Sequence, residues 1–168
     1  EFESFVRREL NATAQRRMAV LHPLKLVLDG WPTDDTGNPV VEWFELINNP
    51  ENPDDGTRRV PFTGELWIEA DDFREDPPRK FFRLSPGREV RLRGAYLVTA
   101  TDVVKSPDGT ITEVHASYDP ESRGGTAPDG RKVKSTMHWV SAAHAISVTA
   151  NLYDRLFSAE IPEIGRAS

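Results

Sequence analysis

The chain has 168 residues, of which 38% are hydrophobic and 29% charged, and its formal net charge is −6 at pH 7. This length fits one domain with a modest core, and the charged fraction predicts a well-solvated surface. The sequence has no cysteine, which excludes disulfides and thiolate metal sites and fits a reducing, cytoplasmic setting. It has no apolar run near the roughly 18 residues of a membrane span, so we expect no membrane partner.

The chain begins with a predicted helix and continues as short strands. Phe5, Val6 and Leu10 recur at helical spacing and predict a helix over residues 4–16. The 13 prolines and 11 glycines that punctuate the chain favour short strands with turns after it. The predicted strands are Leu24–Leu28, Val40–Ile47, Glu65–Glu69, Arg88–Val104, Thr110–Tyr118, Lys132–Val140 and Ile146–Phe157.

Turn-forming residues separate these strands. Asn48–Gly56 reads as a surface loop, Ser106–Gly109 as a tight turn, and Ser141–His144 as a helical turn. Six or more short strands joined by loops predict a mainly β fold, an antiparallel six-stranded β-barrel with a short N-terminal helix.

The charges are unevenly distributed along the chain. The net charge of −6 points away from nucleic acid, because nucleic-acid-binding domains usually have a basic surface. Residues 79–93 nevertheless hold six cations and one anion, Glu89, and further cations lie at 58–59 and 131–134. The acids gather at 34–35, 51–55 and 69–76. Such segregation can steer a polyanion to one face, and an ordinary solvated surface explains it equally well.

The predicted strand from Arg88 gives the clearest geometry. Side chains alternate faces along a strand, so Val90, Leu92 and Tyr96 share the inner face. Arg91 and Arg93 then point outward with Glu89, and can stack on unpaired bases or pair with phosphates. A surface salt bridge to Glu89 is the alternative.

Two further segments admit both an RNA-binding and a structural interpretation. Arg79–Leu84 mixes cations with aromatic rings, as RNA-binding surfaces do, although Phe82 fits a core position equally well. Arg16 and Arg17 lie where the helix gives way to the first strand. That position suits a groove mouth, and a helix C-terminus also favours cations for structural reasons.

The sequence contains no recognisable catalytic motif. The four histidines lack the short ligand spacings of zinc motifs, so we predict no metal site. A triad of His138, Asp154 and Ser141 can be drawn, but no G-x-S-x-G elbow supports it, and we expect His138 and Trp139 to be structural. No G-x-G-x-x-G or Walker motif is present, so we predict neither catalytic residues nor a bound cofactor.

Four segments, in order, resemble strings of the glutaminyl-tRNA synthetase family. They are Arg17–Val27 (R-A-M-A-V then P-h-K-L-V-I in the family), Arg59–Ile68 (V-P-F then E-h-W-I), Arg83–Arg93 (R-L then G-K-E-V-R-L-R) and Asp129–Ala145 (D-G-R-K-V-K then H-W-V-S-A-A-H-A). The last runs on into Leu152–Phe157, which resembles L-Y-D-R-L-F, so the resemblance covers residues from 7 to 158.

The resemblance implies a fold, an activity and a domain division. The family comprises class I synthetases that join glutamine to its tRNA with ATP and magnesium, and their catalytic Rossmann domain lies N-terminal to the segment seen here. This chain alone should therefore be inactive. Residues 1–17 are then a helical linker, residues 18–158 an anticodon-binding β-barrel whose fold is shared with ribosomal protein L25, and residues 159–168 a tail. The alternatives are an L25-like rRNA-binding ribosomal protein, or a small hydrolase using His138 or His144.

The resemblance also implies partners and site residues. The partners are tRNA(Gln), the catalytic domain and the distal barrel of the same protein, in a cytoplasmic monomer. Arg16 matches a residue that binds the middle anticodon uridine, Arg83 one that contacts the guanine ending the anticodon, and Arg91 one near the first anticodon nucleotide. Lys80, which stands where some members have glutamine, and Arg93 complete the expected RNA-binding set.

Overall fold

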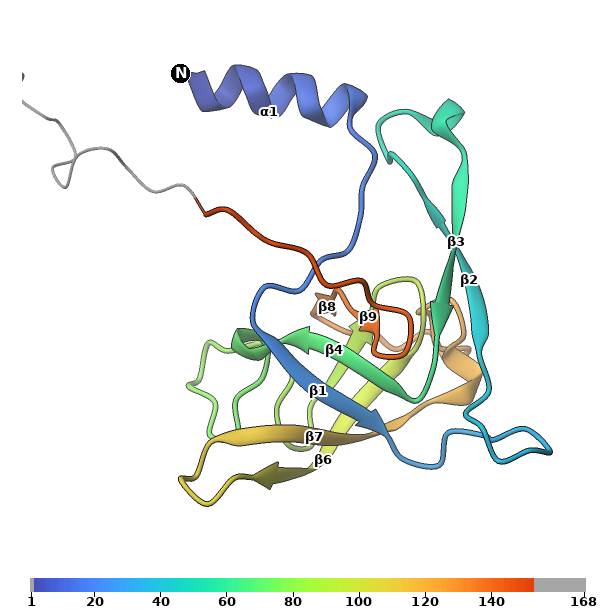
Figure 1. The fold of residues 1–168 in the computed structure, drawn as a ribbon, viewed down its shortest axis with the longest axis vertical. Coiled ribbons are helices and arrows are strands. Elements are labelled where there is room, and N and C mark those ends of the chain that lie inside the picture. Colours follow the sequence, from blue (N-terminus) through green and yellow to red (C-terminus); the bar gives the residue numbers. More distant parts are fainter. Residues whose placement is uncertain (1, 153–168) are drawn as a thin grey trace, which may run out of the picture.

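The structure is a computed structural model that describes residues 2–152. Helix α1, Phe2–Thr13, projects from the top of the molecule, apart from the sheets (Figure 1). It ends before Arg16, where the prediction had placed its end. The backbone amide of Arg16 donates to the carbonyl of Asn48 at 2.6 Å, so the chain has left the helical path there.

One curled sheet and one ribbon make up the rest of the fold. The sheet has seven strands in the order β8-β5-β6-β7-β1-β4-β9. Its strands are β1 (Pro23–Leu28), β4 (Glu65–Glu69), β5 (Glu89–Leu92), β6 (Leu97–Lys105), β7 (Ile111–Tyr118), β8 (Thr136–Met137) and β9 (Val140–Ser141). The ribbon pairs β2 (Glu42–Ile47) with β3 (Thr57–Phe62) and rises beside the linker that follows α1 (Figure 1). Single 3₁₀ turns lie at Pro53–Asp55, Ala70–Asp72 and Pro120–Ser122.

The prediction of a mainly β fold with a short N-terminal helix is confirmed, but the sheet is not an all-antiparallel set of six strands. It has seven strands, and β1 pairs with β7 and β5 with β8 in parallel. Parallel neighbours require a long crossover connection. Both pairs have one, because their strands lie far apart in the sequence. Within residues 2–152, β8 and β9 are the two edges of the sheet and do not pair, yet only two residues separate them in the chain. The sheet therefore curls until its edges come close, without closing.

The predicted strand Arg88–Val104 is wrong, because a tight turn divides it into β5 and β6. Gly94 has φ +65°, which side chains rarely adopt, and the amide of Ala95 donates to the carbonyl of Leu92 at 2.9 Å. Val90, Leu92 and Tyr96 are all buried as predicted, although Tyr96 lies beyond the turn.

Two C-terminal predictions also need correction. Lys132–Val140 is not one strand, because most of its residues pair with no neighbour. It contains the short strand β8 and, at Val140, the first residue of β9. Residues 146–152 form no strand, and Ile146 and Val148 are exposed. The rest of the strand predicted to Phe157 lies outside the described residues. The helical turn at Ser141–His144 is confirmed, since the amide of Ala145 donates to the carbonyl of Ser141 at 2.9 Å.

Aromatic side chains join the ribbon to the sheet. Phe62, at the end of β3, is fully buried, and its ring centroid lies 4.8 Å from that of Trp139 and 5.1 Å from that of Trp31. Phe44 and Tyr96 pack edge-on against the same ring. These contacts fix the base of the ribbon against the sheet, so the surface loops project from a rigid frame.

Candidate nucleic-acid interface

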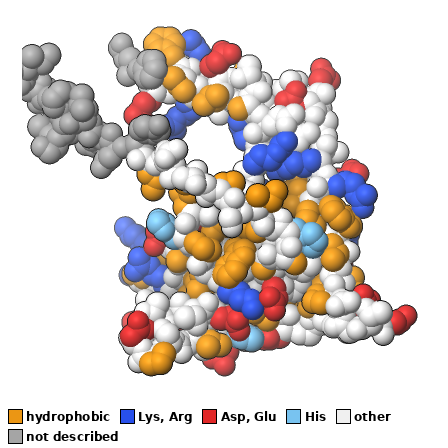
Figure 2. Space-filling view, in the orientation of Figure 1, with side chains coloured by type: hydrophobic (Ala, Val, Ile, Leu, Met, Phe, Trp, Pro, Cys, Tyr) orange, Lys and Arg blue, Asp and Glu red, His pale blue; other side chains and the backbone are white. Residues whose placement is uncertain are grey.

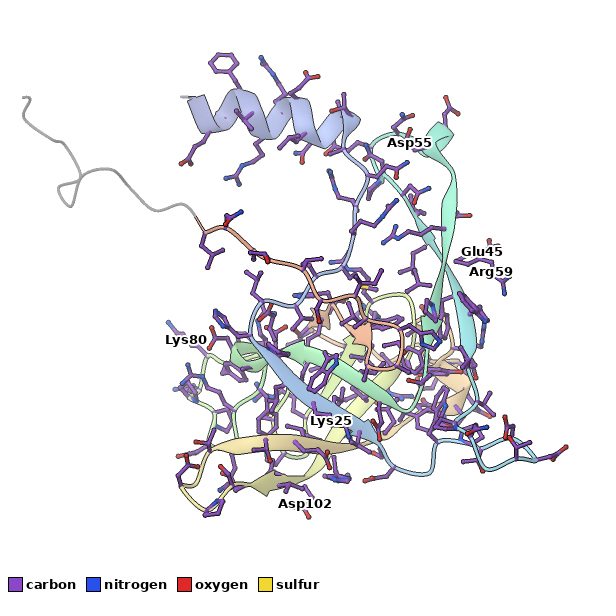
Figure 3. The ribbon with its side chains drawn as sticks, viewed as in Figure 1. Lys25, Glu45, Asp55, Arg59, Lys80 and Asp102 are labelled. Atoms are coloured by element: carbon purple, nitrogen blue, oxygen red, sulfur yellow. The ribbon has the colours of Figure 1, made fainter. Side chains whose placement is uncertain are left out.

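The loop between β4 and β5 carries two of the predicted RNA contacts and is closed at its base. Leu84 is fully buried; its amide donates to the carbonyl of Asp72 at 3.0 Å, and its carbonyl accepts from the amide of Arg74 at 3.1 Å. Lys80 stands exposed at the outer rim of this loop, on the opposite side of the molecule from Arg59 on the ribbon (Figure 3). The loop is therefore held in place at its base, and its cations lie at its outer surface.

Arg83, in the same loop, is the counter-ion of a buried acid. Its Nη1 lies 2.5 Å from Oδ1 of Asp72, a residue only 5% exposed. Burial raises the pKa of Asp72, and the charge of Arg83 opposes that rise. The guanidinium of Arg83 is itself half-exposed, so it can still reach a ligand.

Arg91, in β5, and Arg93, in the turn after it, differ in how far their side chains are held by internal contacts. Arg91 is half-buried, and its Nε donates to the carbonyl of Gly125 at 2.5 Å. Arg93 is exposed, and its side chain makes no hydrogen bond or ion pair to any of residues 2–152. Its backbone is fixed, because its amide donates to Met137 and its carbonyl accepts from Nε1 of Trp139 at 3.0 Å.

A salt bridge between Glu89 and these arginines was the structural alternative, and the structure shows a different pairing. Glu89 binds Arg131, with Oε1 2.8 Å from Nε. Arg131 also binds Asp119 and Asp129, and the three carboxylates together raise its pKa. Glu89 is thus paired with Arg131, which it shares with two other carboxylates, while Arg91 makes no ion pair within the described chain.

The pairing of β5 with β8 adds Lys134, one of the cations at 131–134 that the sequence showed but that the predicted RNA-binding set did not include. Arg91 lies opposite Thr136 in this parallel pair, and Lys134 precedes Thr136 by two positions. The Nζ of Lys134 lies 5.3 Å from the ring centroid of Phe82. Lys134 therefore connects the β4–β5 loop to β5.

We use the term basic face for seven residues of three segments, the β4–β5 loop, β5 with the turn after it, and the segment before β8, which the Lys134–Phe82 contact and the β5–β8 pairing link. It comprises Lys80, Phe82, Arg83, Arg88, Arg91, Arg93 and Lys134. Within residues 2–152, the lysines and arginines that form ion pairs with carboxylates are Lys25, Arg83, Lys105, Arg123 and Arg131. Arg83 is thus the one cation of the basic face that is paired in the described chain. Figure 2 shows cations on the side of the molecule where Lys80 lies.

Arg16 lies apart from the basic face. Its guanidinium donates to the carbonyls of Leu10 and Ala14 and, through Nη2, to Oδ1 of Asn11 at 3.1 Å. These are groups at the end of α1, where a cation also interacts favourably with the helix dipole. The structure therefore gives Arg16 a capping position, apart from the β4–β5 loop that carries Lys80 and Arg83.

The catalytic triad drawn from the sequence is not assembled. Oγ of Ser141 lies 2.9 Å from Nδ1 of His144, whereas His138 lies near Glu69, with Nε2 3.8 Å from Oε1. Asp154 lies outside the described residues. Within 2–152 no cluster of three or more His, Cys, Asp or Glu side chains is placed to bind a metal ion. No helix in this range is long and apolar enough to cross a membrane.

Comparison with known proteins identifies the family. The model of the family described as "tRNA synthetases class I (E and Q), anti-codon binding domain" matches residues 14–119, more than half of the chain. The chain belongs to this family. A second family model with the same description matches residues 136–167.

Individual relatives agree with the family match. The chain is 52% identical over 158 residues to a protein of Nitrobacter winogradskyi named glutamine–tRNA ligase. It is 53% identical over 161 residues to proteins of the same name from Bradyrhizobium diazoefficiens and Rhodopirellula baltica. These alignments cover 94–96% of the chain and 26–28% of the relatives, so the chain spans about a quarter of their length.

Proposed function

We propose that this chain is the anticodon-binding segment of a glutamine–tRNA ligase and helps to select tRNA(Gln) for attachment of glutamine. The observation that carries this proposal is the identity of 52–53%, across nearly the whole chain, to relatives with that name. Because the chain spans about a quarter of those relatives, we assign the reaction with ATP and magnesium to other parts of the longer protein. By itself the chain is then inactive.

The basic face supplies the chemistry for this role. Phosphate contacts dominate the affinity of proteins for RNA, and cations without internal partners are available to make them. An arginine offers a planar fork that matches O6 and N7 of guanine, and it also stacks on bases. We assign the guanine contact to Arg83 and the first anticodon nucleotide to Arg91. Lys80 and Arg93 then serve the neighbouring phosphates.

Arg16 is the fifth residue of the proposed set, and its guanidinium is already hydrogen-bonded to the end of α1. A contact with the middle uridine requires its guanidinium to exchange the helix carbonyls for the base. We therefore propose that Arg16 contacts RNA only when α1 and the linker adjust around the bound anticodon. Arg91 and Arg83 need smaller changes, because each uses only part of its guanidinium internally.

The proposal includes a domain arrangement. We propose that residues 1–17 link to the catalytic domain and that 18–158 form the unit related to the barrel of ribosomal protein L25, with 159–168 as a tail. The second match, 136–167, supports a distal anticodon-binding barrel that continues from β8 and β9. The catalytic domain, the distal barrel and tRNA(Gln) are the proposed partners of a monomeric, cytoplasmic enzyme.

Binding of the chain to labelled tRNA tests the proposal. We expect tighter binding to tRNA(Gln) than to the same tRNA with a changed anticodon, and an affinity that falls between about 50 and 200 mM salt. Arg83→Lys keeps a cation for Asp72 and removes the planar fork, so it should reduce the preference for the glutamine anticodon. Equal binding of both tRNAs by the wild-type chain contradicts the proposal.

Matched charge variants locate the surface. Arg93→Ala removes an unpaired cation of the basic face and should weaken binding several-fold with a smaller salt dependence. Lys105→Ala removes a cation that is already paired with Glu75 at 2.6 Å, and should leave binding nearly unchanged. If both variants lose the same affinity, RNA is not held on the basic face.

A further inference from the structure

Phe82 is an aromatic side chain that the fold holds in solvent. Its side chain is 49% exposed, whereas the neighbouring Phe81 is half-buried and Leu84 is fully buried. Burying a phenylalanine ring usually gains about 1.5–3 kcal/mol. The sequence left open whether Phe82 belongs to the core, and the structure shows that it does not.

The backbone around Phe82 is fixed on both sides. The carbonyl of Phe81 accepts a hydrogen bond from Nη1 of Arg88, and the Cζ of Arg74 lies 5.7 Å from the Phe81 ring centroid. On the other side, Leu84 is anchored by its two backbone hydrogen bonds to Asp72 and Arg74. The ring of Phe82 is thus presented outward by an ordered loop.

Two cations from different segments lie against this ring. The Nζ of Lys134 is 5.3 Å from the Phe82 centroid, and the Cζ of Arg88 is 6.0 Å from it. Neither cation forms an ion pair with a carboxylate of the described chain. A half-exposed ring flanked by unpaired cations matches what a single-stranded nucleotide offers, a flat base and a phosphate.

We propose that Phe82, Lys134 and Arg88 form a subsite for one unpaired nucleotide of the bound RNA. The Phe82 ring stacks on the base, and Lys134 and Arg88 pair with the phosphate next to it. Phenylalanine has no hydrogen-bonding group, so the subsite is tolerant of base identity and contributes affinity and register. The register of β5 with β8 places it beside Arg91, so it extends the basic face rather than standing apart.

This inference rests on the proposed function, since it requires that the basic face binds RNA. The test uses an anticodon stem–loop RNA carrying the fluorescent base 2-aminopurine at each loop position in turn. We expect one position to be quenched on binding, because stacking on an aromatic ring quenches this base. Phe82→Leu keeps an apolar side chain without a π-face and should abolish that quenching while lowering affinity about 5- to 150-fold.

Two further variants make the stacking claim specific. Phe82→Trp enlarges the π-face and should bind at least as tightly as wild type, with quenching retained. Lys134→Ala should lower the slope of log affinity against log salt by about 0.7, because one phosphate contact is lost. Phe82→Leu should leave that slope unchanged, since no charge is removed.

The outcomes separate this inference from the proposed function. If wild type binds the RNA, Arg93→Ala weakens it and Phe82→Leu binds normally, the stacking subsite is overturned and the proposed function stands. In that case we would assign the exposed Phe82 ring to a contact with another protein. If wild type does not bind RNA at all, both ideas fail.

Discussion

Nη1 of Arg83 lies 2.5 Å from Oδ1 of Asp72, and this contact ties a proposed RNA ligand to the stability of its own loop. Asp72 is 5% exposed, and its Oδ2 has no hydrogen-bond partner among the described residues. A buried carboxylate depends on its counter-ion, because desolvation penalises the charged form. Arg83 therefore supports the β4–β5 loop as well as offering a guanidinium to RNA.

Arg83→Ala should lower the free energy of unfolding by about 1–3 kcal/mol at pH 7, since it leaves a buried acceptor without its partner. Burial already raises the pKa of Asp72, so the folded protein binds a proton there more readily than the unfolded chain. Its contribution to stability therefore decreases as pH rises through the folded pKa. The loss in Arg83→Ala should be smaller near pH 4, as urea unfolding at both pH values will measure.

His115 bridges two carboxylates on the outer side of the sheet. Its Nδ1 lies 2.8 Å from Oδ1 of Asp29 and its Nε2 lies 2.9 Å from Oε1 of Glu113. The hydrogen bond to Asp29, more than that to Glu113, raises the pKa of His115. A raised histidine pKa gives stability that is complete below the unfolded value of about 6.5 and is lost as pH rises through the folded value.

The urea midpoint of wild type should therefore fall between pH 6 and pH 9 by more than that of His115→Gln. Glutamine is neutral over this interval and retains a donor and an acceptor, so the difference between the two proteins isolates the imidazole. Parallel pH profiles of the two proteins would show that the two carboxylates do not stabilise the charged ring.

Local sequence patterns predicted the elements and the buried face of β5 well. Val90, Leu92 and Tyr96 are buried, and the strands at Leu24, Glu65 and Thr110 appear where alternation placed them. The alternation of apolar and polar residues wrongly predicted a single strand through Gly94. This glycine has a positive φ and reverses the chain direction there.

The site was predictable in outline only. The cations of residues 79–93 could be read from the sequence, but their partners depend on contacts between distant segments. Arg131 forms its ion pair with Glu89, which lies 42 residues earlier in the sequence. Lys134 lies near Phe82 because β8 pairs with β5 in parallel. Neither contact has a local signature, so only the fold shows which cations remain unpaired.

Arg16 should act measurably on α1 in the free protein. Its guanidinium bonds carbonyls at the end of the helix, and a cation at this position is worth about 0.3–1 kcal/mol. Arg16→Ala should therefore speed amide hydrogen exchange in the last turn of α1 by a few-fold. Arg7→Ala, which removes a cation from the middle of the same helix, is the matched control and should change exchange little. Equal acceleration in both variants would mean that helix charge, rather than capping, is responsible.

Gly94→Ala should be more destabilising than Gly109→Ala. Both glycines have positive φ, +65° and +86°, so each substitution incurs the left-handed strain of about 1–2 kcal/mol. A Cβ at Gly109 meets open space, whereas one at Gly94 collides with Cδ2 of Leu46 on the ribbon. Gly94→Ala must therefore also move the partly buried Leu46 side chain from its packing against the core, and its urea midpoint should fall further. Equal losses would show that the Leu46 side chain moves aside at no cost, leaving backbone strain as the whole effect.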